Sequence, residues 1–262
     1  GYRTKFMKKT EKFFSQFNPN VPIIITNHQT AEMIKYANNS FLATKISFIN
    51  QLANICQEIP DTNIDYIAQA IGLDPRIGNL FLNAGPGYGG SCLPKDIRAI
   101  INLSSKIGVQ PILLNAVEKT NKQQISNIMK LIKHNIGKIK GKKITVLGVA
   151  FKPNTDDIRD STSIELIRRL MKSGAIVTIH DSKALDNARK IFHDNVKYAK
   201  SIPSALKNSQ CAVIMTKWKE YERINNKIIK QMDKKFIIDT RRILSNKNLD
   251  AKYYAIGLGQ KI

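Results

Sequence analysis

The chain has 262 residues and a formal net charge of +22, from 42 Lys and Arg against 20 Asp and Glu. A hydrophobic fraction of 42% supports a packed core and excludes an intrinsically disordered chain. No apolar run approaches the roughly 20 residues of a membrane span, residues 1–10 show no signal-peptide pattern, and three widely spaced cysteines exclude a disulfide framework or a cysteine metal cluster.

The large positive charge has two interpretations: a basic face for nucleic acid, or a site for an anionic, phosphate-bearing ligand. The lysines are spread along the chain in short clusters such as 138–143, and they do not alternate with aromatic residues. No helix-turn-helix, RNA-binding or zinc-finger pattern is present, and the four histidines do not cluster. We therefore expect no metal, no nucleic-acid partner and no membrane partner, and we place the protein in a reducing cytoplasm.

The first part of the chain predicts a helix, a short strand and a long helix. Residues 1–20 carry four phenylalanines at spacings that fit one helix face. Residues 21–26 predict a strand, which Pro22 confines to a sheet edge or a strand start. Residues 30–57 follow a strong helical pattern with Thr30 as the predicted N-cap. Because this helix is apolar on more than one side, we expect it to be buried or to pair with a second subunit.

Lys35 and Asn39 lie four residues apart on this long helix and therefore share one face, where solvent exposure is the simplest interpretation. A second helix is predicted over 63–72, with Gly72 terminating it. A turn around Arg76 follows, and an arginine on such a turn is by default a surface charge. The chain then leads into a glycine-rich loop.

Residues 85–96, Gly-Pro-Gly-Tyr-Gly-Gly-Ser-Cys-Leu-Pro-Lys-Asp, contain the most informative pattern in the chain. Glycine permits positive φ and close approach of the backbone to a ligand, and Pro94 suits the first turn of a helix. We therefore place Cys92 at a helix N-terminus, where the helix dipole and Lys95 favour the thiolate, the form that attacks carbonyl carbon. The alternative is an inert cysteine, because free cysteines are usually buried.

Helices are next predicted over 94–107 and 111–135, and a basic linker at 138–143 predicts a domain boundary. Residues 142–181 follow a strand, loop, helix and strand pattern, which is a βαβ unit. The α/β alternation continues in the segments 201–207, 211–216, 221–232 and 236–239. This predicts an α/β fold, with a central helical domain followed by a Rossmann-like, doubly wound parallel sheet that binds ligands at its strand C-termini. Because no Gly-x-Gly-x-x-Gly follows the first strand, we expect a phosphate-bearing ligand there rather than a dinucleotide.

The segment Gly87–Asp96 resembles the catalytic-cysteine signature of the UDP-glucose 6-dehydrogenase family. Further segments that resemble this family are 31–43, 147–161 and 238–244. Ser91 and the Lys95–Asp96 pair favour the UDP-glucose branch, since the related UDP-N-acetylmannosamine dehydrogenases carry a histidine before the cysteine and lack the pair. The resemblance implies oxidation of UDP-glucose to UDP-glucuronate in two hydride transfers, with NAD as cofactor.

The resemblance also implies catalytic roles. Cys92 would hold the sugar carbon first as a thiohemiacetal and then as a thioester, which water cleaves. Lys35 and Asn39 would stabilise an oxyanion or hold a water. Asp96 would assist proton transfer or fix Lys35.

Binding roles follow from the same resemblance. Lys95 and Arg159 would contact NAD. The implied substrate-binding residues are Lys35, Asn39, Arg76, Phe81, Leu82, Asn83, Ala84, Gly85, Gly89, Phe151, Lys152 and Arg241. Arg76 would reach the sugar site of a second subunit, in a homodimer formed through the 30–57 helix.

The resemblance begins near the end of the family's NAD-binding domain, whose Gly-x-Gly fingerprint and water-orienting glutamate are not found. We therefore expect 1–29 to be a remnant of that domain, 30–136 to be the central helical domain, and 137–262 to be the C-terminal UDP-sugar-binding domain, in a fragment that is inactive alone. The open alternatives are a UDP-N-acetylhexosamine 6-dehydrogenase of the same family and a non-catalytic UDP-sugar-binding and dimerisation module. A nucleic-acid-binding protein is the disfavoured third hypothesis. A separate chain that supplies the NAD-binding domain is the alternative to a truncation.

Overall fold

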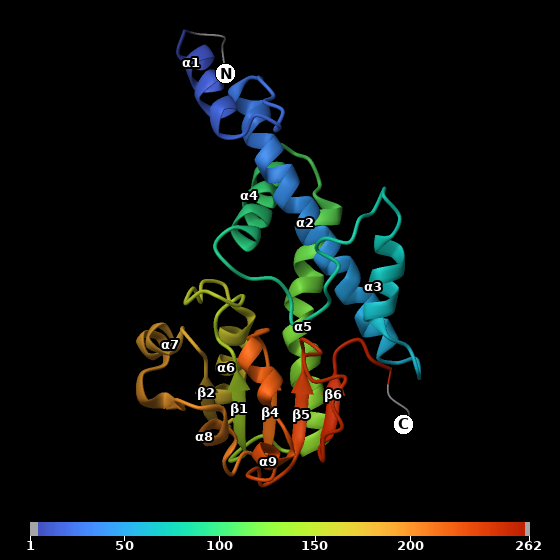
Figure 1. The fold of residues 1–262 in the computed structure, drawn as a ribbon, viewed down its shortest axis with the longest axis vertical. Coiled ribbons are helices and arrows are strands. Elements are labelled where there is room, and N and C mark those ends of the chain that lie inside the picture. Colours follow the sequence, from blue (N-terminus) through green and yellow to red (C-terminus); the bar gives the residue numbers. More distant parts are fainter. Residues whose placement is uncertain (1–4, 260–262) are drawn as a thin grey trace.

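The computed structural model describes residues 5–259, in which a helical half is stacked on one parallel sheet (Figure 1). The helical half consists of α1 (Lys5–Phe17), α2 (His28–Cys56), α3 (Ile64–Gly72), α4 (Leu93–Lys106) and α5 (Ile112–Ile136). The sheet half consists of β1 (Lys143–Leu147), α6 (Thr162–Lys172), β2 (Ile176–His180), α7 (Leu185–Phe192), the 3₁₀ turn η1 (His193–Asn195), β3 (Lys197–Tyr198), α8 (Ile202–Leu206), β4 (Cys211–Ile214), the 3₁₀ turn η2 (Lys219–Arg223), α9 (Asn226–Ile229), β5 (Phe236–Asp239) and β6 (Lys252–Ala255).

Within residues 5–259 the six strands are all parallel and lie in the order β3-β2-β1-β4-β5-β6. The chain enters the sheet in the middle at β1, moves outward through β2 and β3, and then returns to the other side of β1. This is the order of a doubly wound sheet, which binds ligands at the carboxyl ends of the strands beside the switch point between β1 and β4. The predicted α/β fold is therefore confirmed.

Helix α5 belongs to both halves of the molecule. Its first part packs against α2, and its last turns run behind the sheet (Figure 1). Ile125, Ile128, Ile132 and Ile136 on this helix are buried in the same core as the strands. Since these residues recur every three or four positions, one face of α5 is buried and holds the two halves together.

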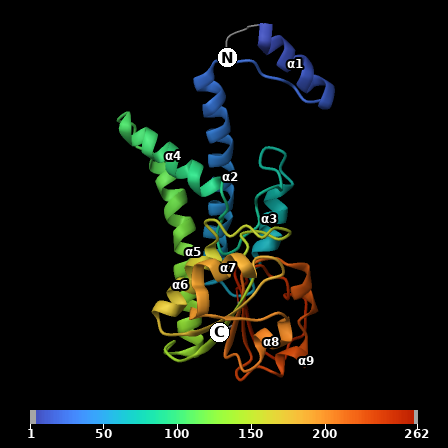
Figure 2. The same ribbon diagram turned by 90° about the vertical axis from the view of Figure 1, so that its left-hand side faces the viewer.

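Helix α2 is 29 residues long, and its first turns stand clear of the sheet together with α1 (Figure 2). Met33, Ile34, Phe41 and Phe48 on α2 are each between 47% and 66% exposed. The same helix buries small and apolar side chains against α4 and α5. The helix is therefore apolar on more than one side, as predicted, and no other described residue covers its outer side.

Three expectations about local structure are wrong. Residues 21–26 form no strand, because no other strand within the described chain hydrogen-bonds to them. Asn27 caps α2 in place of Thr30, since the Asn27 side chain accepts a hydrogen bond from the Thr30 N–H at 2.8 Å. The helix expected over 221–232 is instead a 3₁₀ turn followed by the short α9, because Asn225 adopts an extended backbone and caps a new helix.

Arg242 joins the two halves at the carboxyl edge of the sheet. Its guanidinium donates from Nε to the Asp65 carboxylate of α3 at 2.8 and 2.9 Å. It also donates to the carbonyls of Ile256 and Ala84, each at 3.0 Å. The Arg242 side chain is only 5% exposed, so these bonds form a buried junction between α3, the loop after it and the end of β6.

Candidate active site

Cys92 lies at the N-cap of α4, with Pro94 in the first turn of the helix. Its side chain is exposed, and the Ser91 hydroxyl lies 3.7 Å from its sulfur. The other two cysteines, Cys56 and Cys211, are buried. The prediction that the cysteine of the glycine-rich loop lies at the start of a helix is confirmed, and its thiol is accessible to a ligand.

The side chain of Asn121 on α5 holds one side of this loop. Its Oδ1 accepts a hydrogen bond from the Tyr88 N–H at 2.8 Å, and its Nδ2 donates to the Tyr88 carbonyl at 3.0 Å. Gly87 precedes Tyr88 with φ of +102°, and a Cβ there would come within 2.7 Å of Asn121 Oδ1. Only glycine therefore permits this close approach of loop and helix.

The sheet half holds the other side of the loop. The Gly90 N–H donates to the carbonyl of Arg159 at 2.9 Å. Gly90 has φ of +88°, and a Cβ there would come within 2.7 Å of the Phe151 ring. The position of Cys92 two residues later therefore depends on both halves of the molecule.

Asp96, in the first turn of α4, gathers two side chains of α2. Its Oδ2 accepts hydrogen bonds from Lys35 Nζ and, at 2.5 Å, from Asn39 Nδ2. The Asp96 side chain is fully buried, whereas Lys35 is half exposed. The shared helix face predicted for Lys35 and Asn39 is therefore turned toward α4 and not simply toward solvent.

The electrostatics of this cluster follow from its geometry. Burial alone would raise the pKa of Asp96, but the hydrogen bonds from Lys35 and Asn39 outweigh burial and hold that pKa below its usual value. The hydrogen bond to Asp96 raises the pKa of Lys35, and the negative charge of a Cys92 thiolate adds to this effect. Lys35 therefore lies within electrostatic reach of Cys92, as an ammonium near a nucleophile.

Two adjoining pockets lie between the cysteine loop and the carboxyl edge of the sheet. The strand-end pocket has a volume of about 640 Å³ and is lined by Asp65, Ala68, Gln69, Asn79, Leu82, Asn83, Ala84, Phe151, Lys152, Pro153, Lys217, Arg241 and Arg242. The loop pocket has a volume of about 430 Å³ and is lined by Ile46, Asn50, Leu80, Phe81, Asn83, Gly85, Gly87, Tyr88, Gly89, Leu93, Phe151, Lys152 and Arg241. Four residues line both pockets, so a single extended ligand could occupy the two.

Arg241 lies at the boundary of these pockets. Its Nε donates to the carbonyl of Met215 at 2.8 Å, and a Cβ on Gly85 would come within 2.9 Å of its Nη1. Burial, with a smaller contribution from the charge of Arg242, lowers the pKa of Arg241 to about 10. A partly buried guanidinium whose charge is destabilised in this way favours an anionic ligand, which would offset the cost of desolvating the charge.

The structure brings most of the predicted substrate residues together. Those that line one or both of the two pockets are Phe81, Leu82, Asn83, Ala84, Gly85, Gly89, Phe151, Lys152 and Arg241. Lys35, Asn39 and Asp96 form the separate cluster beside Cys92. Arg76 lines neither pocket, because its side chain is 87% exposed and pairs with Asp74 two residues earlier.

The two predicted cofactor residues are exposed cations. Lys95 is 65% exposed, and its Nζ lies 3.7 Å from Asp96. Arg159 is 70% exposed and pairs with Asp157 at 2.7 Å. The hydrogen bond to Asp157 raises the pKa of Arg159, and the charge of a Cys92 thiolate contributes as well. Both cations therefore lie at the outer side of the cysteine site.

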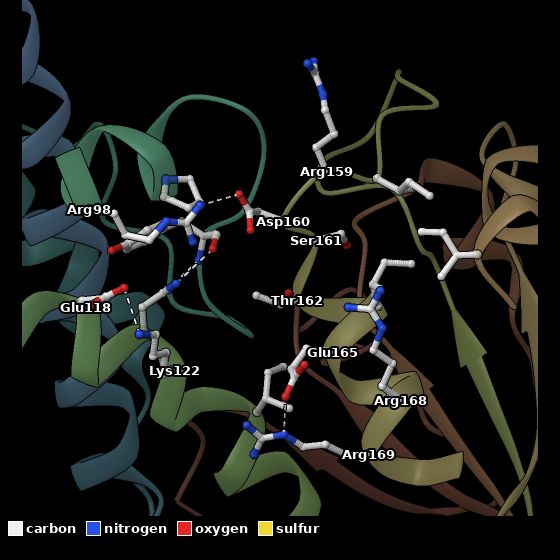
Figure 3. A pocket seen from close by; sticks show the side chains of 17 residues that line it. Arg98, Glu118, Lys122, Arg159, Asp160, Ser161, Thr162, Glu165, Arg168 and Arg169 are labelled. Atoms are coloured by element: carbon white, nitrogen blue, oxygen red, sulfur yellow. Dashed lines mark hydrogen bonds and ion pairs between the residues drawn. The ribbon is translucent and has the colours of Figure 1, made fainter. Parts of the chain in front are cut away.

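A third cavity, of about 540 Å³, lies between α4, α5 and α6 behind the cysteine loop (Figure 3). Arg98 and Asp160 pair across its rim at 2.9 Å, and Arg169 pairs with Glu165. Figure 3 shows Arg159 directed away from this cavity. Because carboxylates compensate most of its cations, this cavity is a weaker anion site than the strand-end pocket.

Within residues 5–259 no three His, Cys, Asp or Glu side chains gather as metal ligands would. No helix in the same range combines the length and apolarity that crossing a membrane requires.

Comparisons with known proteins match both halves of the chain. The model for the UDP-glucose/GDP-mannose dehydrogenase family, central domain, matches residues 29–123. The model for the UDP-glucose/GDP-mannose dehydrogenase family, UDP binding domain, matches residues 145–246. The cysteine loop and Asn121 fall in the first match, and Arg241 falls in the second.

Among curated proteins, UDP-glucose 6-dehydrogenase of Rickettsia felis is 43% identical over 240 residues, which cover 89% of this chain and 53% of that protein. UDP-glucose 6-dehydrogenase TuaD of Bacillus subtilis is 40% identical over 90% of this chain and 52% of its own length. The solved structure of a UDP-glucose dehydrogenase from Pyrobaculum islandicum superposes with a TM-score of 0.86 at 31% identity, over 96% of this chain and 57% of that one. The chain thus spans about half the length of the relatives that it matches.

Proposed function

Because the chain belongs to the UDP-glucose/GDP-mannose dehydrogenase family, we propose that it is the cysteine-bearing and sugar-nucleotide-binding part of a UDP-glucose 6-dehydrogenase. Such an enzyme oxidises C6 of UDP-glucose to the carboxylate of UDP-glucuronate. The observation that carries the proposal is the exposed Cys92 at a helix N-terminus, beside the Lys35–Asn39–Asp96 cluster and a pocket rich in unpaired cations.

Cys92 is the proposed nucleophile. Its thiolate adds to the carbonyl carbon of the aldehyde formed in the first oxidation and gives a thiohemiacetal. Loss of a hydride from that carbon leaves a thioester, and water then cleaves the C–S bond to release the acid and the thiol. Lys35 and Asn39 stabilise the oxyanion that develops on the former carbonyl oxygen. Asp96 fixes Lys35 and Asn39 in place, or alternatively assists proton transfer at the reacting carbon.

NAD, when bound, would accept the hydride in both oxidations. The residues of this chain fit only the anionic part of that cofactor, because Lys95 and Arg159 are exposed cations near Cys92. We propose that these two side chains contact its phosphates. The rest of the cofactor site would belong to an NAD-binding domain, of which residues 1–29 are the proposed remnant.

The two adjoining pockets form the proposed UDP-glucose site. Lys152 and Arg241, at the carboxyl ends of β1 and β5, would contact the diphosphate. Phe151 and the segment 81–85, with Gly89, would line the nucleotide and the sugar. The C6 of glucose would then face the cysteine loop.

We further propose a homodimer through α2, whose outer apolar side no described residue covers. The exposed turn that carries Arg76 would then lie at the substrate site of the partner subunit. The proposed division is 30–136 for the central helical domain and 137–262 for the UDP-sugar domain. A reducing cytoplasm is the proposed location, since Cys92 acts as a free thiol.

Isothermal titration calorimetry with UDP-glucose tests the proposal, beside an NADH absorbance assay. We expect the wild-type chain to bind UDP-glucose, and we expect Cys92→Ser to bind it with less than a threefold change. No binding by the wild-type chain would contradict the proposal. Binding without NADH production fits both the proposed fragment, which is expected to be inactive alone, and the alternative of a UDP-sugar-binding and dimerisation module. Tighter binding of a UDP-N-acetylhexosamine than of UDP-glucose would favour the alternative sugar.

A further inference from the structure

We propose that Lys217 is a third cation of the diphosphate site, beside Lys152 and Arg241, and that its ammonium group contacts a phosphate oxygen of the nucleotide sugar. This inference rests on the proposed function, because it takes a nucleoside diphosphate sugar as the ligand. Nothing in the sequence pattern singles out Lys217, which is one of many lysines on a strongly basic chain.

The sheet topology places these three cations side by side. Lys152 follows β1, Lys217 follows β4, and Arg241 follows β5. These strands are neighbours in the order β1-β4-β5, so their carboxyl ends meet at one edge of the sheet (Figure 1). The switch point between β1 and β4 is where a doubly wound sheet binds its ligand. Lys217 therefore lies at the carboxyl end of β4, between the loop after β1 that carries Lys152 and the loop after β5 that carries Arg241.

The residues around Lys217 are fixed by buried hydrogen bonds. Thr216 Oγ1 donates to the carbonyl of Ala150 at 2.6 Å, which ties the β4 loop to the β1 loop. The carbonyl of Met215 accepts from Arg241 Nε at 2.8 Å, which ties it to the β5 loop. Thr216 and Met215 are each 1% exposed, whereas Lys217 is exposed and lines the strand-end pocket. The Lys217 side chain therefore extends into the pocket from a backbone segment that hydrogen bonds fix to both neighbouring loops.

The charges of the strand-end pocket are not balanced by its own residues. Its lining contains four cations and one carboxylate, Asp65, which Arg242 already binds. Among the described residues, Lys152, Lys217 and Arg241 have no ion-pair partner. Charge-assisted hydrogen bonds to phosphate oxygens would compensate these three cations. Lys152 and Arg241 follow the two strands that flank β4, so the three cations surround one position. A diphosphate is therefore a better match than a neutral ligand.

The test compares Lys217→Ala with Lys219→Ala, which removes an exposed lysine two residues later that does not line the pocket. Binding of UDP and of uridine to the full chain is measured by titration calorimetry. We expect Lys217→Ala to weaken UDP binding about tenfold, which is the size of one charge-assisted contact, and to change uridine binding less than twofold. Lys219→Ala should change neither, and Lys217→Arg should restore UDP binding to within about threefold.

Equal UDP affinity in Lys217→Ala and the wild-type chain would overturn the assignment of Lys217 while leaving the proposed function intact. An equal loss of UDP and uridine affinity would overturn it too, because Lys217 would then act on the nucleoside or on the fold. If the wild-type chain itself bound no UDP, the proposed function would fail, and the inference would fall with it.

Discussion

The carboxylate of Asp96 on α4 accepts a hydrogen bond from the ammonium group of Lys35, which lies 61 residues earlier on α2. The carboxylate is fully buried and the ammonium half exposed, so the pair depends on the packing of these two helices. Asp96 Oδ1 has no hydrogen-bond partner within residues 5–259, although Lys95 Nζ lies 3.7 Å away. The pair therefore couples the start of the cysteine-bearing helix to the long helix α2.

This pair makes the free energy of unfolding depend on pH in the acidic range. The pKa of Asp96 is lower in the folded protein than its usual 3.8, and such a group stabilises the fold above its unfolded pKa. That contribution disappears as the pH falls through the folded pKa. We expect Asp96→Asn to lower the free energy of unfolding by about 1–2 kcal/mol at pH 7 and to lose less stability than the wild type below pH 3.8.

Urea unfolding at pH values from 7 to 3 measures this difference. Asp186→Asn is the matched control, because its side chain is 96% exposed at the start of α7. The explanation would be wrong if Asp96→Asn and the wild type lost stability in parallel across this range.

Asn121 provides a second prediction, because its side chain makes both hydrogen bonds to the backbone of Tyr88. Asn121→Ala removes both bonds and leaves the Tyr88 N–H without a partner. We expect the amide hydrogens of Tyr88 and Gly90 to exchange at least tenfold faster, with a loss of about 1–2 kcal/mol in the free energy of unfolding. Hydrogen exchange followed by NMR or mass spectrometry measures the loop directly.

The control for this variant is Gln123→Ala, an exposed position on the same helix. Its exchange pattern in the cysteine loop should equal that of the wild type. Unchanged exchange at Tyr88 in Asn121→Ala would show that the two hydrogen bonds from Asn121 do not hold the cysteine loop in place.

Cysteine accessibility gives the third prediction. Cys92 is exposed, whereas Cys56 and Cys211 are buried, and burial raises the pKa of the Cys211 thiol far above its ordinary value. We expect iodoacetamide to label one thiol per folded chain, and Cys92→Ser to label none. Mass spectrometry of the labelled peptides reads this out. Labelling of Cys211 at a comparable rate, without prior unfolding, would contradict the structure.

The sequence predicts the fold well where the hydrophobic periodicity is strong and where proline or glycine marks the end of an element. The doubly wound sheet follows from the βαβ pattern of 142–181, and the helix start at Cys92 follows from Pro94 and the glycines. No pattern indicated α7, β3 or β6, which are short, and the strand expected over 21–26 has no partner. Strand formation depends on pairing, which a local pattern does not report.

The same distinction holds for the candidate site. Lys35 and Asn39 could be placed on one helix face from their spacing, but their common partner Asp96 lies on another helix. Asn121 carries no local signal, because its function comes from a contact 33 residues away along the chain. Lys217 was inconspicuous among many lysines until the strand order placed it beside Arg241. The contacts of Asn121 and Lys217 appear only in the folded chain, whereas the link between Asp96 and Lys35 was implied by the family resemblance and not by the local pattern.

Arg242 provides the last prediction, since its guanidinium connects α3, the segment before the cysteine loop and the end of β6. Arg242→Ala would leave two carbonyls, those of Ala84 and Ile256, without this donor. We expect a loss of about 3 kcal/mol in the free energy of unfolding, because the side chain is buried and every bond is charge-assisted. Asp65→Ala should cost less, since the Asp65 side chain is 52% exposed.

Lys122→Ala is the control for this comparison, because it breaks an ion pair in which the lysine is 68% exposed. It should change the free energy of unfolding by less than about 0.5 kcal/mol in urea denaturation. The order expected is therefore Arg242→Ala, then Asp65→Ala, then Lys122→Ala, from the largest loss to the smallest. A loss for Arg242→Ala as small as that for Lys122→Ala would mean that the Arg242 junction does not hold the two halves together.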